Sequence, residues 1–268
     1  MQYLTIKDRF HGLQGLNRGS SKIFREIMQT VKLFAMPVHN VTLGESLECI
    51  DRMVQGGGAH LVVTLGVEMV MRAKGDPEFV RLVQGASLVV PDSSGILWAC
   101  RHYGNPLRER VPGIDILQET ARQADKYPWR VFFLGGKPGV AQEAARRMRE
   151  EYPEFRVAGH HHGYFDDDAP VIEAIRDAKT QVLFVALGSP AQEKWFHKNR
   201  ESLGDIVAIG VGGSLDVVSG QVRRAPVFFQ KTGTEWLYRL LTQPSRIGRM
   251  MALPAFAVKV LTSKGDKL

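Results

Sequence analysis

The stretch RVFFLGG at 130–136, followed by GVAQEAARRMREEY at 139–152, decides the fold. The first segment is a short apolar run that ends in two glycines, and the second repeats small and apolar residues at helical spacing. A run that is apolar on both faces predicts a strand buried between two layers, and the helical pattern predicts one of those layers. Together they predict a strand, a glycine turn and a helix, the repeating unit of an α/β fold.

Runs of the same kind recur along the chain. They are HLVVTL (60–65), ASLVVPD (86–92), FRVAGHHHGYF (155–165), QVLFVALG (181–188) and DIVAIGVGG (205–213). Helical patterns lie between most of them, which predicts a parallel sheet covered on both sides. We place a boundary between two α/β halves near Tyr127–Pro128. No Gly/Ser linker separates the halves, so we expect them to pack together.

The two ends of the chain differ from this core. We expect residues 1–37 to form an N-terminal extension and residues 38–220 to form the α/β core. Residues 221–268 are basic, aromatic and mostly helical in pattern, which predicts a C-terminal appendage. Its last run, MMALPAFAVKVL, is too short to span a membrane, and it fits either an interfacial anchor or a packed core helix.

Composition limits the partners of the protein. The chain has 268 residues and a formal charge of +7, which favours anionic partners such as phosphorylated substrates, acidic lipids or nucleic acid. Nucleic acid is not expected, because no known nucleic-acid module is present. No apolar run is long enough to cross a bilayer, so we expect a cytoplasmic protein, at most peripheral to the membrane. Cys49 and Cys100 are expected to be inert buried thiols.

Ligands of open parallel sheets bind beyond the carboxyl ends of the strands. Asp92 directly follows a predicted strand, where a carboxylate could act as a general base or could cap the next helix. Gly135 and Gly136 begin a turn whose N–H groups could hold a phosphate, although a tight turn alone would also need glycines there.

Two polar clusters admit a metal site. Asp166, Asp167 and Asp168 could bind a metal ion, but they precede Ala169-Pro170 and a helix, where acidic caps are expected. His160, His161 and His162 cannot all face one ion, because consecutive strand residues alternate sides. We therefore favour structural roles for both clusters.

The appendage concentrates arginines. Arg246 and Arg249 are three residues apart on a helix that Pro244 can start, so they share a face, and Arg239 could converge with them. Guanidinium groups bind phosphate oxygens well and could neutralise a diphosphate leaving group. A solvated or lipid-facing basic surface is the alternative.

In this order, the motifs of the chain resemble those of the WecG/TagA/CpsF family of bacterial glycosyltransferases. The resemblance extends over roughly residues 38–260. Its motifs are Val-Val-Thr (62–64), Pro-Asp-x-x-Gly (91–95), Glu-Arg-Val-Pro-Gly-x-Asp (109–115), Phe-Leu-Gly-Gly-x-Pro-Gly-Val (133–140), His-Gly-Tyr-Phe (162–165), Ala-Leu-Gly-x-Pro-x-Gln-Glu (186–193), Gly-Val-Gly-Gly-x-Leu-Asp (210–216), Arg-Arg-Ala-Pro (223–226) and Glu-Trp-Leu-Tyr-Arg-Leu with Pro-x-Arg-x-x-Arg (235–249).

The resemblance implies a fold and a reaction. The fold would be two Rossmann-like halves that form a cleft, closed by the C-terminal appendage in a GT-E-like arrangement. The reaction would be an inverting, metal-independent transfer from a UDP-sugar to a polyprenyl-diphosphate-linked sugar in cell-wall or exopolysaccharide assembly. No cofactor would be needed. The appendage would lie at the membrane surface, and a homo-oligomer is compatible with its apolar sequence.

The resemblance also implies roles for individual residues. Asp92 matches the proposed base, and Thr64 matches a threonine beside the donor sugar. The residues that match the nucleotide and sugar pocket or the diphosphate-facing cations are Tyr164, Gln192, Asp216, Arg239, Arg246 and Arg249.

The chain departs from the family pattern at two positions. Gly66 stands where an asparagine is common, and Ser93 stands where a glycine is usual. Two other hypotheses therefore stay open: a noncatalytic nucleotide-sugar-binding scaffold, and a metal-dependent enzyme that uses Asp166 and Asp168.

Overall fold

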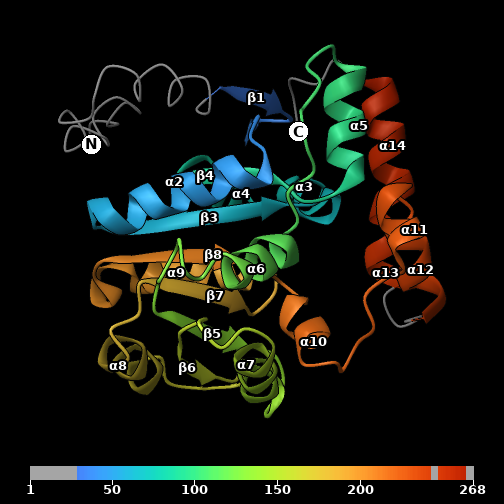
Figure 1. Ribbon diagram of the computed structural model, residues 1–268. Coiled ribbons are helices and arrows are strands. Elements are labelled where there is room, and N and C mark those ends of the chain that lie inside the picture. Colours follow the sequence, from blue (N-terminus) through green and yellow to red (C-terminus); the bar gives the residue numbers. More distant parts are fainter. Residues whose placement is uncertain (1–28, 243–246, 264–268) are drawn as a thin grey trace, which may run out of the picture.

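One parallel sheet forms the centre of the protein. The computed structural model describes residues 29–242 and 247–263 (Figure 1). The strands of this sheet are β3 (Ala59–Leu65), β4 (Leu88–Pro91), β5 (Val131–Gly135), β6 (Val157–His161), β7 (Val182–Ala186) and β8 (Ile206–Gly210). They lie in the order β4-β3-β8-β7-β5-β6, and every neighbouring pair is parallel. The predicted α/β class with a Rossmann-like parallel sheet is confirmed.

The two predicted halves share this sheet. Strands β3 and β4 precede Tyr127, and the other four follow it. The halves meet where β3 pairs with β8, from Ala59 opposite Ile206 to Val63 opposite Gly210. Both strands lie inside the sheet, β3 between β4 and β8, and β8 between β3 and β7. The halves are therefore two sides of one continuous layer.

Alternating residues of each strand point to opposite faces, and both faces are buried. On one face, Val62, Phe133 and Ile209 pack under α2 (Leu43–Gly56), α6 (Gly113–Arg122) and α7 (Val140–Glu151). The opposite face is covered by helices from both halves. They are α3 (Val67–Ala73), α4 (Pro77–Gln84), α5 (Ser94–His102), α8 (Ala169–Asp177) and α9 (Ala191–Leu203). This period of two explains why the strands read as unbroken apolar runs.

A hairpin before the core was not predicted. Strands β1 (Thr30–Leu33) and β2 (Met36–His39) pair antiparallel, and Leu33, Phe34 and Met36 are fully buried. Residues 30–39 therefore belong to the packed structure, while residues 1–28 of the expected extension lie outside the described residues.

The end of the chain returns to the first half. After α10 (Ser214–Val218) come α11 (Val227–Lys231), α12 (Glu235–Thr242), α13 (Ile247–Met250) and α14 (Ala252–Thr262). Helix α14 lies beside α5 (Figure 1), where Phe256 is buried against Phe34 and the Tyr103 hydroxyl donates to Val260 O at 2.9 Å. Within residues 29–242 and 247–263, every helix is too short or too polar to cross a bilayer.

Candidate active site

Two predicted catalytic residues lie at the carboxyl edge of the first half. Thr64, next to the end of β3, is buried, and its hydroxyl donates to Gly210 O on β8 at 2.6 Å. Asp92 follows β4, and its backbone N–H donates to Leu65 O at 3.0 Å. The sheet thus holds both residues at one edge.

Gly113 connects these two side chains. Its N–H donates to Asp92 Oδ1 at 3.1 Å, and a Cβ at Gly113 would stand only 3.3 Å from Thr64 Oγ1. Gly113 is also the first residue of α6, where the exposed N–H groups of the helix favour a nearby carboxylate. Asp92 is half-buried, so it combines a fixed position with access from outside.

Ser93 and Gly66 take positions that explain part of the departure from the family pattern. The Ser93 hydroxyl accepts from the Val67 N–H at 3.3 Å, which links the starts of α5 and α3. A Cβ at Gly66 would stand 3.9 Å from Asp92 Oδ2. An asparagine at residue 66 would therefore reach the carboxylate, and glycine leaves that space open.

The glycine turn after β5 is shaped by its neighbours. Gly135 and Gly136 have φ values of 131° and 72°, which favour glycine. The Gly136 N–H donates to Ala186 O at 3.2 Å, and Gly136 O accepts from the Gly163 N–H at 2.8 Å. These contacts support the interpretation of the turn as a packing element, and binding of a phosphate there stays a prediction.

The structure places Tyr164, Gln192 and Asp216 at different depths. Gln192 is 4% exposed, and its Oε1 accepts from the Gly212 N–H at 3.4 Å. Asp216 is half-buried on α10. Tyr164 is 65% exposed and follows β6, which is the edge strand opposite to β4. Five strand spacings, about 24 Å, separate these edges, so one ligand reaches both Tyr164 and Asp92 only by lying along the sheet.

Contacts that the sequence did not predict attach the appendage to this edge. Arg110 pairs with Glu235 of α12 at 3.1 Å, and Ser94 Oγ donates to Gly233 O at 2.9 Å. Arg224 forms an ion pair with Asp115 on α6. Arg110, Asp115, Arg224 and Glu235 all occur in motifs quoted above, but no local pattern says which of them pair.

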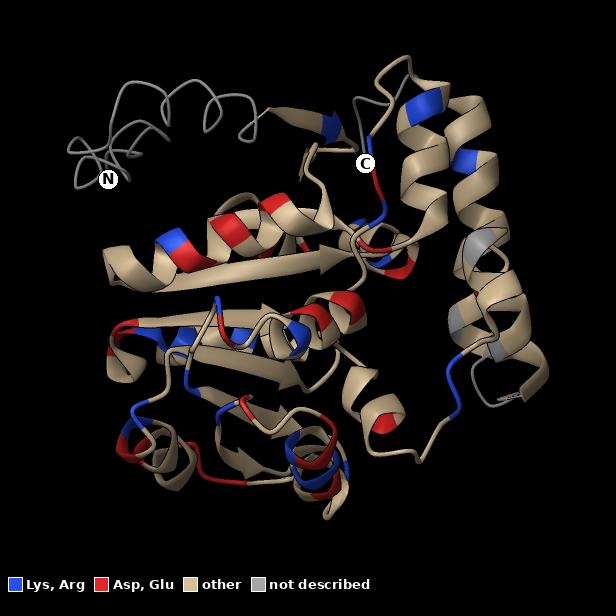
Figure 2. Cartoon of the chain, viewed as in Figure 1, with Lys and Arg blue, Asp and Glu red and all other residues tan. Residues whose placement is uncertain are grey.

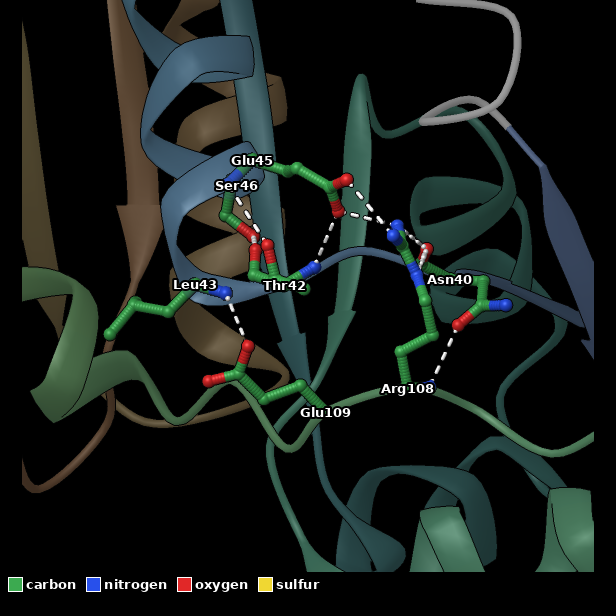
Figure 3. Close-up of polar contacts among 7 residues, drawn as sticks. All are labelled: Asn40, Thr42, Leu43, Glu45, Ser46, Arg108 and Glu109. Atoms are coloured by element: carbon green, nitrogen blue, oxygen red, sulfur yellow. Dashed lines mark hydrogen bonds and ion pairs between the residues drawn. The ribbon is translucent and has the colours of Figure 1, made fainter. Parts of the chain in front are cut away.

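The loop that carries Arg110 is itself fixed to the core. The Arg108 guanidinium donates to Asn40 O at 2.6 Å and forms an ion pair with Glu45 of α2 (Figure 3). The neighbouring Glu109 accepts from the Leu43 N–H at 3.1 Å. Because the same loop leads to the start of α6, these contacts help to position the group that donates to Asp92.

Two of the three arginines predicted to face the diphosphate lie on described helices of the appendage. Arg239 is in α12 and Arg249 is in α13, whereas Arg246 lies outside the described residues. Figure 2 shows few charged residues on the strands and a basic linker that leads into α11. The sequence of this linker includes Arg223 and Arg224. Convergence of the three arginines on a diphosphate stays a prediction.

A family model for the WecG/TagA/CpsF family of glycosyl transferases matches residues 31–267. The chain belongs to this family. Similar proteins include three that are named N-acetylglucosaminyldiphosphoundecaprenol N-acetyl-beta-D-mannosaminyltransferase. The protein from Bacillus spizizenii is 37% identical over 77% of this chain and 80% of its own length. Those from Bacillus subtilis and Staphylococcus aureus are each 33% identical, over 90% and 87% of this chain and 94% and 93% of theirs.

In this family member the aspartate cluster has structural partners. Asp168 accepts from Trp195 Nε1 at 2.8 Å, Lys198 Nζ at 2.7 Å and Asn199 Nδ2 at 3.0 Å, all on α9. These donors lower the pKa of Asp168, although burial acts in the opposite direction and is the largest single effect. Asp167, one residue before the N-cap of α8, accepts from the Ala169 N–H at 3.0 Å. The favoured structural role is thus visible for these two aspartates.

The two cysteines of this family member are buried free thiols, as predicted. Burial raises the pKa of Cys49 to about 12 and that of Cys100 to about 11. Both groups stay protonated at neutral pH, which suits the expected inert role.

Proposed function

We propose that the protein transfers N-acetylmannosamine from UDP to an N-acetylglucosamine that is linked to undecaprenyl diphosphate. The family supports glycosyl transfer, and the names of the three relatives support this sugar and this acceptor. The observation that carries the proposal is the position of Asp92. Its carboxylate lies at the carboxyl edge of the sheet, where it accepts from the Gly113 N–H. Gly113 also packs closely against Thr64.

In the proposed mechanism, Asp92 is the general base. It accepts the proton of the acceptor hydroxyl while that oxygen attacks the anomeric carbon, and UDP leaves from the opposite face, so the configuration inverts. Thr64 lies beside the donor sugar. Its hydroxyl is already directed to Gly210 O, so it offers the donor its remaining lone pairs and its methyl group.

Charge on the departing UDP needs compensation. We propose that Arg239, Arg246 and Arg249 supply it and that no metal ion is required. Preorganised cations stabilise charge that develops in the transition state, usually by the largest single catalytic effect. The occupied carboxylate of Asp168 supports this choice over a metal site at Asp166 and Asp168.

The open space at Gly66 bears on donor choice. A family member with asparagine there would place an amide near Asp92, and this chain leaves room for a bulkier sugar substituent. A donor screen should therefore compare UDP-linked N-acetylmannosamine, its uronic acid form and glucose.

The decisive assay combines these donors with a synthetic polyprenyl-diphosphate N-acetylglucosamine. We expect transfer of N-acetylmannosamine by the wild type, unchanged by EDTA. Full dependence on Mg²⁺ or Mn²⁺ would contradict the metal-independent mechanism. UDP binding without transfer to any lipid-linked acceptor would instead favour a noncatalytic scaffold.

The appendage is proposed to lie on an anionic membrane surface. Its exposed apolar side chains are large in number and close to basic residues, a combination typical of interfacial helices. They include Val227, Phe228, Trp236, Leu237, Leu241, Met251, Val258 and Leu261. Phe228 and Leu241, the two most exposed, are 71% and 72% accessible.

Co-sedimentation with anionic lipid vesicles tests this placement. We expect the wild type to bind, and the double variant Phe228→Ser, Leu241→Ser to lose about tenfold or more in partitioning, because burial of one such side chain contributes about 1.5–3 kcal/mol. Neutral vesicles provide the control for the electrostatic part. Equal sedimentation of both proteins would refute the role, and loss of a dimer in the variant would assign the surface to self-association.

A further inference from the structure

A buried acid lies directly behind the proposed catalytic edge. Glu193 is in the first turn of α9 and is 1% exposed. Its Oε1 accepts from Gln192 Nε2 at 2.8 Å, while its Oε2 is buried and has no hydrogen-bond partner among the described residues. A polar group held in this way destabilises a fold, so a functional reason for its presence is expected.

Gln192 connects this acid to the turn that follows β8. Its Oε1 faces the Gly212 N–H, and its Nε2 would stand 2.4 Å from a Cβ at Gly210. Only glycine at residue 210 allows the Gln192 amide to lie directly on the strand backbone. Glu193 is part of the same contact, because its Oε1 would stand 3.4 Å from that Cβ.

The turn after β8 contacts Thr64 directly and is linked to Asp92 through Gly113. Gly210 O accepts the Thr64 hydrogen bond. A Cβ at Gly113, the residue that donates to Asp92, would stand 3.2 Å from Val211 Cα. A continuous row of close contacts therefore runs from the buried acid, through Gln192 and the turn, to Thr64 and to the donor that holds Asp92.

We propose that Glu193 is a positioning residue for the transfer reaction, holding the Gln192 amide in place and thereby fixing the turn from Gly210 to Gly212 against Thr64 and Gly113. This inference rests on the proposed function for its catalytic part. It assigns Gln192 a supporting task within the protein, because its amide is already occupied by Glu193 and Gly212.

The surroundings of Glu193 favour the neutral form. Burial raises the pKa of the Glu193 carboxyl. This effect outweighs the Gln192 amide, the backbone N–H of Glu193, the nearby Ser189 hydroxyl and the charge of Arg72, which all act in the opposite direction. At the start of α4, which packs against α9, Asp76 and Glu78 are already paired with Lys194. The strand β8 consists of aliphatic residues and glycine, so it offers no compensating charge.

The histidine of β3 does not change this assessment. His60 lies at the opposite end of its strand, where its ring binds Ser87 Oγ and Gly57 O. The ionisable residues of α8 (Glu173, Arg176 and Asp177) are exposed to solvent.

Two substitutions of matched size test the role. Glu193→Leu fills the same space without an acceptor, and Glu193→Gln keeps a carbonyl oxygen that can accept from Gln192. We expect Glu193→Leu to lower kcat by about tenfold to a hundredfold with little change in the donor KM, because misplaced groups chiefly affect the reacting geometry. Glu193→Gln should recover most of that loss. Glu201→Leu, at an exposed position of the same helix, is the control.

A second readout does not depend on activity. Hydrogen exchange of the Gly212 N–H, which donates to Gln192, should become faster in Glu193→Leu and stay slow in Glu193→Gln, while both melt near the wild-type temperature. Unchanged exchange and unchanged kcat in Glu193→Leu would overturn the proposal. Equal loss of kcat in both variants would overturn it as well, because an acceptor would not matter.

These arms separate the inference from the proposed function. If the wild type transferred no sugar from any donor, the proposed function would fail, and the exchange measurement would still decide whether Glu193 holds the turn. If the wild type is active and the exchange is unaffected, the proposed function stands and the positioning role fails.

Discussion

The carboxyl edge of the sheet, where the proposed catalytic residues Thr64 and Asp92 lie, differs from the appendage in how its polar groups are held. At the edge, Thr64 and Asp92 bond to backbone groups of two other elements, and Gly113 fits between them without space for a side chain. The appendage is attached by side-chain contacts such as Arg110 with Glu235 and by the buried Phe256 and Val260, and many of its other apolar side chains are exposed. Backbone hydrogen bonds therefore fix the geometry of the carboxyl edge, whereas side-chain contacts attach the appendage.

This difference suggests a division of tasks. A base must stay within hydrogen-bond distance of one hydroxyl, so its position has to be set by the sheet. Cations that face a diphosphate act over longer distances and tolerate movement, so the helices of the appendage can carry them. The proposed mechanism needs both regions, and each prediction below separates them.

The largest effect is expected at the edge. Asp92→Asn should reduce kcat by about 10²–10⁴-fold, the usual contribution of a general base, and should leave UDP affinity near normal. Steady-state transfer and calorimetric UDP binding measure the two quantities. Asp166→Asn, in the exposed aspartate cluster, is the matched control and should retain the wild-type rate. Retention of most activity in Asp92→Asn would show that Asp92 is not the general base.

A somewhat smaller effect is expected in the appendage. Arg239→Ala or Arg249→Ala should lower kcat on the order of 10²-fold, because each would remove a preorganised cation from the leaving group. Arg101→Ala, an exposed arginine of α5, is the control. Wild-type kinetics in both appendage variants would mean that charge on UDP is compensated elsewhere. Point variants are required, because removing residues after Gly220 would also uncover the core around Phe256.

His39 allows a test of how strand β4, which precedes Asp92, is held in place. Its Nδ1 accepts from the Val89 N–H of β4 at 3.0 Å, and burial lowers its pKa to about 4. The neutral ring stabilises the fold fully above the unfolded pKa of about 6.5, and this contribution is lost as pH falls toward 4. The full change in the free energy of unfolding is about 3 kcal/mol, because each tenfold change in proton affinity corresponds to about 1.4 kcal/mol.

A comparison of variants isolates this effect. His39→Asn can still accept from Val89 but does not titrate, so its unfolding free energy relative to wild type should improve between pH 6.5 and pH 4. His197→Asn, at an exposed position, is the control. Parallel pH curves for wild type and His39→Asn would show that β4 is held in another way.

The sequence predicted the sheet because burial on both faces leaves a local signature. Each of the six apolar runs that were predicted as strands corresponds to one, as RVFFLGG contains β5 (Val131–Gly135). The strand order had no such signature, since β3 pairs with β8 across almost 150 residues of chain. The hairpin at Thr30–His39 was missed for a related reason: its burial comes from β4, α4 and α5, later in the chain, and at Phe34 also from Phe256 of α14.

The candidate site was predicted in part for the same reason. Thr64 and Asp92 stand at strand ends, which a pattern can locate, and the structure brings them together at Gly113. The pairing of Arg110 with Glu235 depends on the path of the appendage, which follows no periodicity. Gln192 can be buried against residue 210 only because that residue, 18 positions later in the chain, is a glycine without a Cβ. A sequence motif does not predict that contact.

The smallest expected effect concerns the attachment itself. Arg110 and Glu235 are largely buried, with side-chain exposures of 19% and 13%, so their coupling should exceed that of an ordinary surface pair. A double-mutant cycle with Arg110→Gln and Glu235→Gln should give a coupling of about 1 kcal/mol in the free energy of unfolding. The pair Arg146 and Glu150 on α7, exposed at 54% and 63%, is the control and should couple less. If this ion pair holds the appendage against the carboxyl edge, each single variant should also lower kcat. High salt should reduce the coupling of Arg110 with Glu235 less than that of Arg146 with Glu150, because a buried pair is screened less. Equal coupling in the two cycles would mean that the appendage is held by its apolar contacts at Phe256 and Val260 and that the ion pair is incidental.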